Sequence, residues 1–225
     1  TERGFNENEI RLLTDDTDVK PTKANILVGI KWLVEGSTST SKLFFHYSGH
    51  GSQQHDKNGD EDDGLDETIV PLDFQTGGQI IDDELSYLLV DSLAPGAELF
   101  GLLDCCHSAS LLDLKYCYKV STQPGNTTYT ISASDKYKSK NCLVTTISGC
   151  LDNQQSADAF IARTFQGAMT ANFLKTYATL KAAGKTISYK NLMKNLLAAL
   201  RAQGFPQVPQ MYCSKFISMD AALTI

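Results

Sequence analysis

Two apolar segments of the chain each end in residues that can do nucleophilic chemistry. Residues 42–47 lead into Ser-Gly-His-Gly, which places His50 between two glycines, and residues 99–103 lead into Asp-Cys-Cys-His, which contains Cys105 and Cys106. A cysteine thiol beside a histidine that is distant in sequence but adjacent in space forms an activated nucleophile. Glycines beside the histidine let backbone amides approach a ligand. The two segments therefore predict a Cys–His pair.

The elements that precede these residues must bring them together. Each apolar run has the length of a buried strand, and the polar segment after it is typical of a loop from a parallel strand to a helix. Ligands bind beyond the carboxyl ends of such strands. We therefore expect an α/β fold with a mainly parallel sheet covered on both faces. Further strands are expected at 10–13, 68–73, 79–81, 143–148 and within 210–219, and helices at 22–35, 82–93, 111–114, 157–180 and 188–203.

The composition narrows the possible functions. The chain has 225 residues, 42% hydrophobic and 20% charged, which suits one globular domain with a substantial core. Its net charge of −6 argues against a nucleic-acid or membrane partner and suits a cationic substrate or a metal ion. There is no apolar run of roughly 20 residues, and the first residues are too polar for a signal peptide. The six cysteines show no C-x-x-C spacing, so a reducing cytoplasm is expected.

Residues 51–67 carry seven acidic residues and one lysine, a composition that is compatible with a calcium-binding EF-hand loop. Four residues match ligand positions one, three, five and twelve of such a loop: Asp56, Asn58, Asp60 and Glu67. However, Glu61 stands where the loop needs glycine, and no amphipathic helix flanks either end. An EF-hand is therefore disfavoured. A carboxylate-rich site of another geometry stays open, because hard cations need several oxygen ligands.

Five motifs follow one another along nearly the whole chain. They are H-Y-S-G-H-G at 46–51, D-E-T-I-V-P-L-D-F at 66–74, I-D-D-E-L at 81–85, D-C-C-H-S at 104–108 and S-G-C-x-D-x-Q-x-S-A-D-A at 148–159. In order and spacing they resemble the type I metacaspases, whereas the Q-A-C-x-G signature of animal caspases is absent. The resemblance implies a caspase-like three-layer α/β/α sandwich in a single domain, 1–225. Its parts are a p20-like part at 1–116, an exposed linker loop at 117–142 and a p10-like part at 143–225.

Two features depart from the family pattern. The family has a strand and a helix before the point where this sequence starts, and Thr1 to Phe5 hold no counterpart, so the p20-like part is expected to lack its first strand and helix. Ala109 stands where the family usually has glycine, and its Cβ is expected to tighten the loop beside the nucleophile.

The resemblance assigns the catalytic roles. Cys106 matches the family nucleophile, and His50 would orient or deprotonate it and protonate the leaving amine. The backbone amides of Gly51 and Cys106 are the candidate oxyanion donors. Cys105 is expected to be a small buried packing residue, and His107 to point away from the site.

The resemblance also assigns a substrate pocket. Asp104 and Ser48 each lie two residues before a catalytic residue and match family pocket positions. A buried carboxylate binds a guanidinium in bidentate fashion, which predicts Arg preferred over Lys. The simpler alternative is that Asp104 caps the helix that follows it.

Four aspartates match the positions that bind calcium in the family: Asp66, Asp82, Asp83 and Asp113. The simpler alternative is that Asp82 and Asp83 cap a helix, that Asp66 is solvated and that Asp113 pairs with a lysine. Residues 117–141 are expected to form a long exposed loop with at most one strand, near 129–132. Three lysines in it are candidates for cleavage of the chain by itself: Lys136, Lys138 and Lys140.

Together these observations predict a calcium-dependent cysteine endopeptidase. It would cleave protein or peptide substrates after Arg or Lys, as a cytoplasmic monomer without nucleic-acid or membrane partners. Two alternatives stay open. One is a weakly active or inactive calcium-responsive binding or scaffold protein, and the other is a related cysteine peptidase with Asn or Asp specificity.

Overall fold

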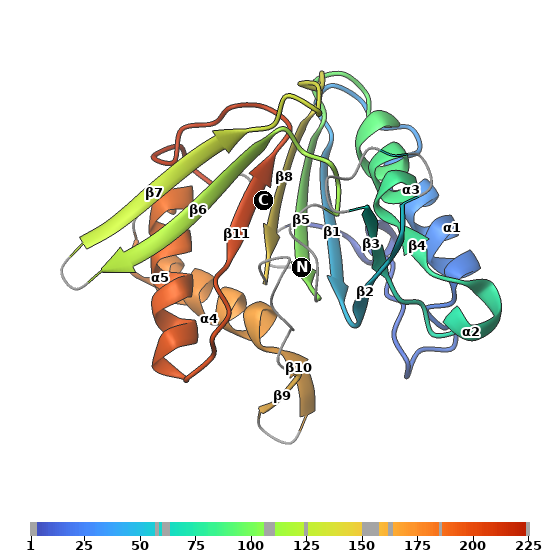
Figure 1. The fold of residues 1–225 in the computed structure, drawn as a ribbon, viewed down its shortest axis with the longest axis horizontal. Coiled ribbons are helices and arrows are strands. Elements are labelled where there is room, and N and C mark those ends of the chain that lie inside the picture. Colours follow the sequence, from blue (N-terminus) through green and yellow to red (C-terminus); the bar gives the residue numbers. More distant parts are fainter. Residues whose placement is uncertain are drawn as a thin grey trace.

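A six-stranded sheet forms the centre of the molecule (Figure 1). The computed structural model describes residues 4–56, 59, 64–105, 111–123, 126–149, 158–161, 164–184 and 186–223. In sheet order the strands are β1 (Lys42–Ser48), β5 (Glu98–Asp104), β8 (Leu143–Ser148), β11 (Gln210–Cys213), β6 (Tyr116–Gln123) and β7 (Asn126–Ala133). β1, β5 and β8 are parallel to one another, and the other neighbours are antiparallel. The expected parallel sheet is formed by these three strands, and the sheet as a whole is mixed.

Two smaller sheets adjoin the central one. The first is three-stranded and contains β2 (Gly51–His55), β3 (Leu65–Ile69) and β4 (Ile80–Ile81), all paired antiparallel. It begins three residues after the end of β1. The second is the hairpin of β9 (Asp158–Ile161) and β10 (Thr164–Gly167), which leads directly into α4.

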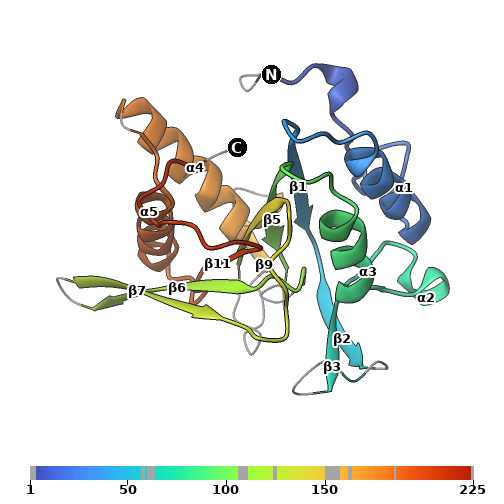
Figure 2. The same cartoon turned by 90° about the horizontal axis from the view of Figure 1, so that it is seen from above.

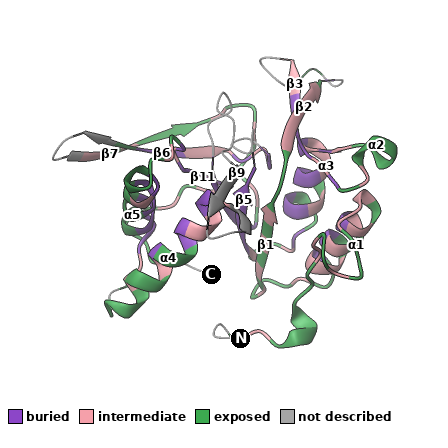
Figure 3. Ribbon diagram, turned by 90° about the horizontal axis from the view of Figure 1, so that it is seen from below, coloured by how far each residue is buried: buried purple, intermediate pink, exposed green. Residues whose placement is uncertain are grey.

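Helices cover both faces of the central sheet, so the molecule has three layers (Figure 2). One face carries α1 (Lys23–Val34), α3 (Asp82–Ser86) and the π-helical turn η2 (Tyr87–Asp91), and the other carries α4 (Ala168–Ala182) and α5 (Tyr189–Ala202). The buried faces of α3, α4 and α5 point toward the sheet (Figure 3). Two short helices complete the set: η1 (Glu7–Glu9) and α2 (Phe74–Gly77).

The strand β5 shows why this sheet has two covered faces. Six of its seven residues are buried. Leu99 and Leu103 belong to the core under α1 and α3, whereas Phe100 and Leu102 belong to the core under α4 and α5. Successive side chains of a strand point to opposite faces, so a continuous apolar run requires cover on both sides.

The predicted helices at 22–35 and 188–203 are confirmed. The α1 helix begins after Thr22, whose hydroxyl accepts a hydrogen bond from the Asn25 N–H at 3.3 Å. The α5 helix begins after Ser188, whose hydroxyl accepts one from the Asn191 N–H at 3.2 Å. Such caps satisfy backbone donors that the first helical turn leaves without partners.

The expectation of a long loop after residue 116 is wrong. Residues 116–133 form the β6–β7 hairpin, in which Val120 pairs with Tyr129. Tyr118 and Val120 are buried against α5, whereas Lys119 and Ser121 are exposed. Alternation of this kind marks a half-buried strand, and the many hydroxyl and lysine side chains of its outer face concealed it in the composition.

Three other local expectations are wrong for identifiable reasons. Residues 10–13 pair with no strand of the described chain, and Leu13 instead packs beside α1. Residues 111–114 form a turn rather than a helix, because Asp113 has a positive φ of 50° that interrupts helical backbone. Residues 158–161 and 164–167 are strands, so the helix predicted from 157 begins only at Ala168.

Candidate active site and acidic cluster

The ends of β1 and β5 bring the two predicted reactive segments together. The strands are parallel and in register, so Ser48 pairs with Asp104. The pairing continues past the strand ends, where the Gly49 N–H donates to the carbonyl oxygen of Asp104 at 3.3 Å. His50 is the next residue after Gly49. It therefore lies close to the end of β5, where the chain continues to the two cysteines. Cys106, His107 and Ala109 lie outside the described residues.

Main-chain hydrogen bonds fix the backbone of His50, while the residue itself is exposed. Its carbonyl oxygen accepts from the Tyr47 hydroxyl at 2.8 Å and from the Val70 N–H at 3.0 Å. The next residue, Gly51, pairs with Ile69 at the start of β2. His50 thus lies at the junction between the six-stranded and the three-stranded sheets.

The first of the two adjacent cysteines is a core residue, as predicted. Cys105 is 0% exposed and packs in the core under α1 and α3. A thiol that is enclosed in this way is an inert packing group rather than an accessible nucleophile.

The side chains of Asp104 and Ser48 both lie close to Gly167, the residue that precedes α4. Asp104 is 2% exposed, and its Oδ2 accepts a hydrogen bond from the Thr170 N–H at 2.7 Å. A Cβ placed on Gly167 would overlap the Asp104 carboxylate and would lie 2.8 Å from Ser48 Oγ. The chain at Gly167 therefore lies against both side chains. We call His50, Ser48 and Asp104 the strand-end site.

Asp104 does cap a helix, but it is not the helix that was expected directly after β5. The helix whose N-terminus it satisfies is α4, since Thr170 is the third residue of that helix and lies 66 positions later in the chain. The expected helix directly after β5 is not the partner, because residues 111–114 form a turn. Asp104 thus stabilises a distant helix N-terminus.

His46 belongs to this region and was not assigned by sequence reasoning. Its Nε2 lies 3.2 Å from Thr170 Oγ1. Desolvation lowers the pKa of His46, and the nearby Asp104 carboxylate opposes part of that change. Positions 46 and 48 share one face of a strand, because side chains alternate with a period of two residues. This period could have identified His46 as a neighbour of Ser48.

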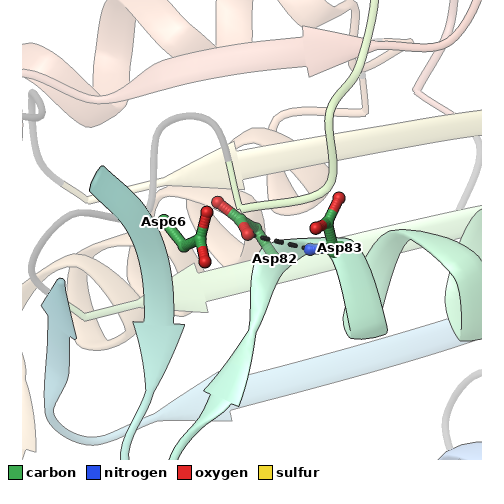
Figure 4. A group of neighbouring side chains, drawn as sticks. All are labelled: Asp66, Asp82 and Asp83. Atoms are coloured by element: carbon green, nitrogen blue, oxygen red, sulfur yellow. Dashed lines mark hydrogen bonds between the residues drawn. The ribbon is translucent and has the colours of Figure 1, made fainter. Parts of the chain in front are cut away.

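The acidic cluster consists of Asp66, Asp82 and Asp83 (Figure 4). Among the described residues, these three offer carboxylate oxygens that lie within 4.8 Å of one another. Asp66 comes from β3, and Asp82 and Asp83 are the first residues of α3. Asp66 and Asp82 are buried, so the alternative of a solvated Asp66 is wrong.

Asp82 connects the two elements of the acidic cluster. Its carboxylate accepts hydrogen bonds from the N–H groups of Glu67 and Asp83, both at 2.8 Å. Burial raises the pKa of Asp82 to about 7, these hydrogen bonds oppose the increase, and the charges of Glu67 and Asp66 add to it. Several hard oxygens in one buried place form a donor set that fits a divalent cation such as calcium or magnesium.

The fourth predicted ligand, Asp113, is not a member of this cluster. Its neighbour Leu112 approaches α3, since the Ser86 hydroxyl donates to the Leu112 carbonyl oxygen at 3.2 Å. The EF-hand alternative is also disfavoured by the fold, because residues on both sides of the acidic loop form the antiparallel strands β2 and β3 rather than helices.

The predicted processing lysines lie between β7 and β8. Lys136 and Lys138 are exposed. Lys140 is half-buried and forms an ion pair with Asp91. Within the part of the chain that the structure describes, no helix is both long and apolar enough to cross a membrane.

Comparison with known proteins agrees with this architecture. A solved crystal structure of a protein from Geobacter sulfurreducens superposes with a TM-score of 0.58 and 25% identity, over 88% of this chain and 75% of that one. The two molecules thus share an α/β fold, and in this chain a histidine-bearing turn lies beside a cysteine-bearing strand end.

The sequence comparisons identify the family. Residues 1–115 match the model of the metacaspase, peptidase C14 domain. Metacaspase-1 of Eremothecium gossypii is 35% identical over 94% of this chain, and Metacaspase-1 of Kluyveromyces lactis is 36% identical over 96%. The chain therefore belongs to the metacaspase family of C14 peptidases. It spans 56% and 59% of the length of these two relatives.

Proposed function

We propose that this chain is the catalytic domain of a type I metacaspase, a cysteine endopeptidase that uses Cys106 and His50. The observation that supports the proposal is the register of β1 with β5, in which Ser48, two residues before His50, lies opposite Asp104, two residues before Cys106. Family membership supports the reaction class.

In this mechanism the Cys106 thiolate attacks the scissile carbonyl carbon, and the peptide C–N bond then breaks. His50 accepts the thiol proton and delivers it to the departing amine. Backbone N–H groups of Gly51 and Cys106 stabilise the oxyanion that forms on the carbonyl oxygen, each contributing about 3 kcal/mol in comparable sites. Water then hydrolyses the acyl-enzyme. Fixing the His50 backbone from two sheets keeps the base in position for both proton transfers.

We further propose that Asp104 and Ser48 select a basic residue before the scissile bond. Both groups converge at Gly167, and Asp104 is a buried carboxylate. A planar guanidinium can bind such a carboxylate through two hydrogen bonds, so Arg is preferred over Lys. Because Asp104 also accepts from Thr170, substrate binding and the start of α4 share one acceptor group.

The acidic cluster is the proposed calcium site, with Asp113 as a further ligand. Bound calcium would supply positive charge that offsets the repulsion among the carboxylates. Asp66 lies on β3, the strand that ends beside Val70, and Val70 donates to the carbonyl oxygen of His50. The cluster and the catalytic base thus lie on one continuous hydrogen-bonded element. Calcium suits flexible sites drawn from several segments better than magnesium does.

The proposal includes cleavage of the chain by itself after Lys136 or Lys138, because both are exposed. It also includes monomeric action in the cytoplasm on protein substrates.

A panel of fluorogenic peptides tests the proposed function. Peptides with Arg, Lys, Asp or Asn before the cleaved bond are compared in calcium and in chelator, with Cys106→Ala as the control. Cleavage of the Arg and Lys peptides that requires calcium and Cys106 is expected. Cleavage only after Asn or Asp would support the related-peptidase alternative, and no cleavage of any peptide would support the scaffold alternative.

A further inference from the structure

We propose that Tyr47 is a positioning residue whose hydroxyl holds the His50 turn in its catalytic geometry. The inference rests on the proposed role of His50 as the base. It adds a residue that does not contact the reacting atoms and acts only through the backbone of the histidine.

The Tyr47 hydroxyl lies among backbone groups from both sheets. It donates to the His50 carbonyl oxygen at 2.8 Å, and it lies 3.2 Å from both the N–H and the carbonyl oxygen of Val70. The Val70 N–H also donates to His50 at 3.0 Å. One side chain therefore connects the end of β1, the His50 turn and the end of β3.

The turn is shaped around this side chain. A Cβ on Gly49 would lie 2.8 Å from the Tyr47 hydroxyl oxygen and 3.0 Å from Cζ, closer than carbon atoms normally approach. A side chain at position 49 would therefore displace the end of the Tyr47 ring. Gly49 thus lets the turn lie close to the end of the Tyr47 ring, whose hydroxyl donates to the His50 carbonyl oxygen.

The chemical state of the hydroxyl suits this role. Burial is the main cause that raises the pKa of Tyr47 above its usual value, with a smaller contribution from Cys105. The group therefore stays a neutral donor throughout the range in which a cysteine peptidase works. The ring packs against the core under α1 and α3, so it is anchored independently of the hydroxyl.

Tyr118 offers a matched control. Its hydroxyl donates to the Ile217 carbonyl oxygen at 2.9 Å and accepts from the Ile217 N–H at 2.8 Å, so it also holds a distant backbone segment. It lies on β6, in the core under α4 and α5 and away from the strand-end site. Tyr47→Phe and Tyr118→Phe therefore remove the same atom from the same kind of contact.

The first measurement compares kcat and KM of the two variants on an Arg peptide. Tyr47→Phe is expected to lower kcat about 10-fold with KM nearly unchanged, because small displacements of a catalytic group cost rate. Tyr118→Phe is expected to keep the wild-type kcat while losing comparable thermal stability. Equal kcat values for Tyr47→Phe and the wild type would overturn the inference, and so would an equal loss of kcat in both variants.

The second measurement uses iodoacetamide alkylation of Cys106 and separates this inference from the proposed function. Tyr47→Phe is expected to slow alkylation in the wild-type background and to have no further effect in a His50→Ala background. An equal slowing in both backgrounds would show that Tyr47 does not act through His50. If His50→Ala itself retained full peptidase activity, the proposed function would fail instead.

Discussion

The strand-end site and the acidic cluster are assembled by different forces. The strand-end site is held by backbone pairing, because Ser48 lies opposite Asp104 and the Gly49 N–H donates to Asp104. In the acidic cluster, the fold holds the carboxylates of Asp66, Asp82 and Asp83 close to one another, where their like charges repel. A site built on the main chain is preorganised without a ligand, whereas a cluster of like charges is most stable with a cation. This difference predicts that ligand removal and mutation affect the two regions differently.

The largest expected effect comes from removing the proposed nucleophile. Cys106→Ala is expected to lower kcat by about 10⁴-fold or more, because the covalent step is lost. Cys105→Ala is expected to keep most of the activity, since Cys105 is a core residue with 0% exposure. Steady-state assays on an Arg peptide measure both variants. Similar losses in the two would contradict the assignment of roles to the adjacent thiols.

The next effect tests Asp104 as a substrate-binding group. Asp104→Ala is expected to lower kcat/KM on Arg peptides about 100-fold, through loss of a charge-assisted contact, and to cost about 1 kcal/mol of stability through the lost α4 cap.

Ser188→Ala is the matched control for Asp104→Ala. Ser188 caps α5 by accepting from the Asn191 N–H, so its loss should cost similar stability with no change in kcat/KM. Both stabilities follow from urea unfolding. If Asp104→Ala lost stability alone, Asp104 would be a helix cap and not part of a pocket.

The acidic cluster is expected to bind calcium itself, whereas the strand-end site is not. Calorimetry on the Cys106→Ala protein is expected to show binding heat at millimolar calcium, and calcium at 100 times Kd should raise the unfolding free energy by about 2.7 kcal/mol. Both effects should disappear when Asp82 and Asp83 are changed to Ala.

Asp220→Asn serves as the control for this loss of acidic charge. Asp220 is exposed and paired with Lys190 on the surface, so calcium binding should persist in that variant. Unchanged calcium binding after Asp82 and Asp83 are changed to Ala would show that the acidic cluster is not the calcium site.

The smallest expected effect concerns the lysines after β7. Self-cleavage is expected after Lys136 or Lys138, since Lys140 is half-buried and paired with Asp91. Lys140→Ala should leave the cleavage position unchanged and should alter stability by less than about 1 kcal/mol, as is usual for partly exposed ion pairs. Intact mass spectrometry after calcium addition locates the break. Loss of the break in Lys140→Ala would contradict this prediction and would identify Lys140 as the cleavage site.

Local sequence signals were sufficient for several parts of the molecule. Several features act within a few residues, so their patterns are visible in the chain: the start of α1 at Thr22, the buried run of β5 and the glycines around His50. The packing of Cys105 in the core was also predicted, because unpaired cysteines are often small buried residues. The motifs indicated which residues to consider because they carry chemically reactive groups at fixed spacing.

Only the tertiary structure decided the contacts between distant segments. The hydrogen bond from Thr170 to Asp104 spans 66 positions, and the contact of Tyr47 with Val70 spans 23. Sequence periodicity predicts neither contact, because each depends on how two elements pack against each other in the folded protein. The β6–β7 hairpin forms a strand pair rather than a loop for the same reason, since Tyr118 and Val120 are buried in a core that distant elements such as α5 complete. Periodicity reports which side of an element is apolar, whereas packing determines which partner covers it.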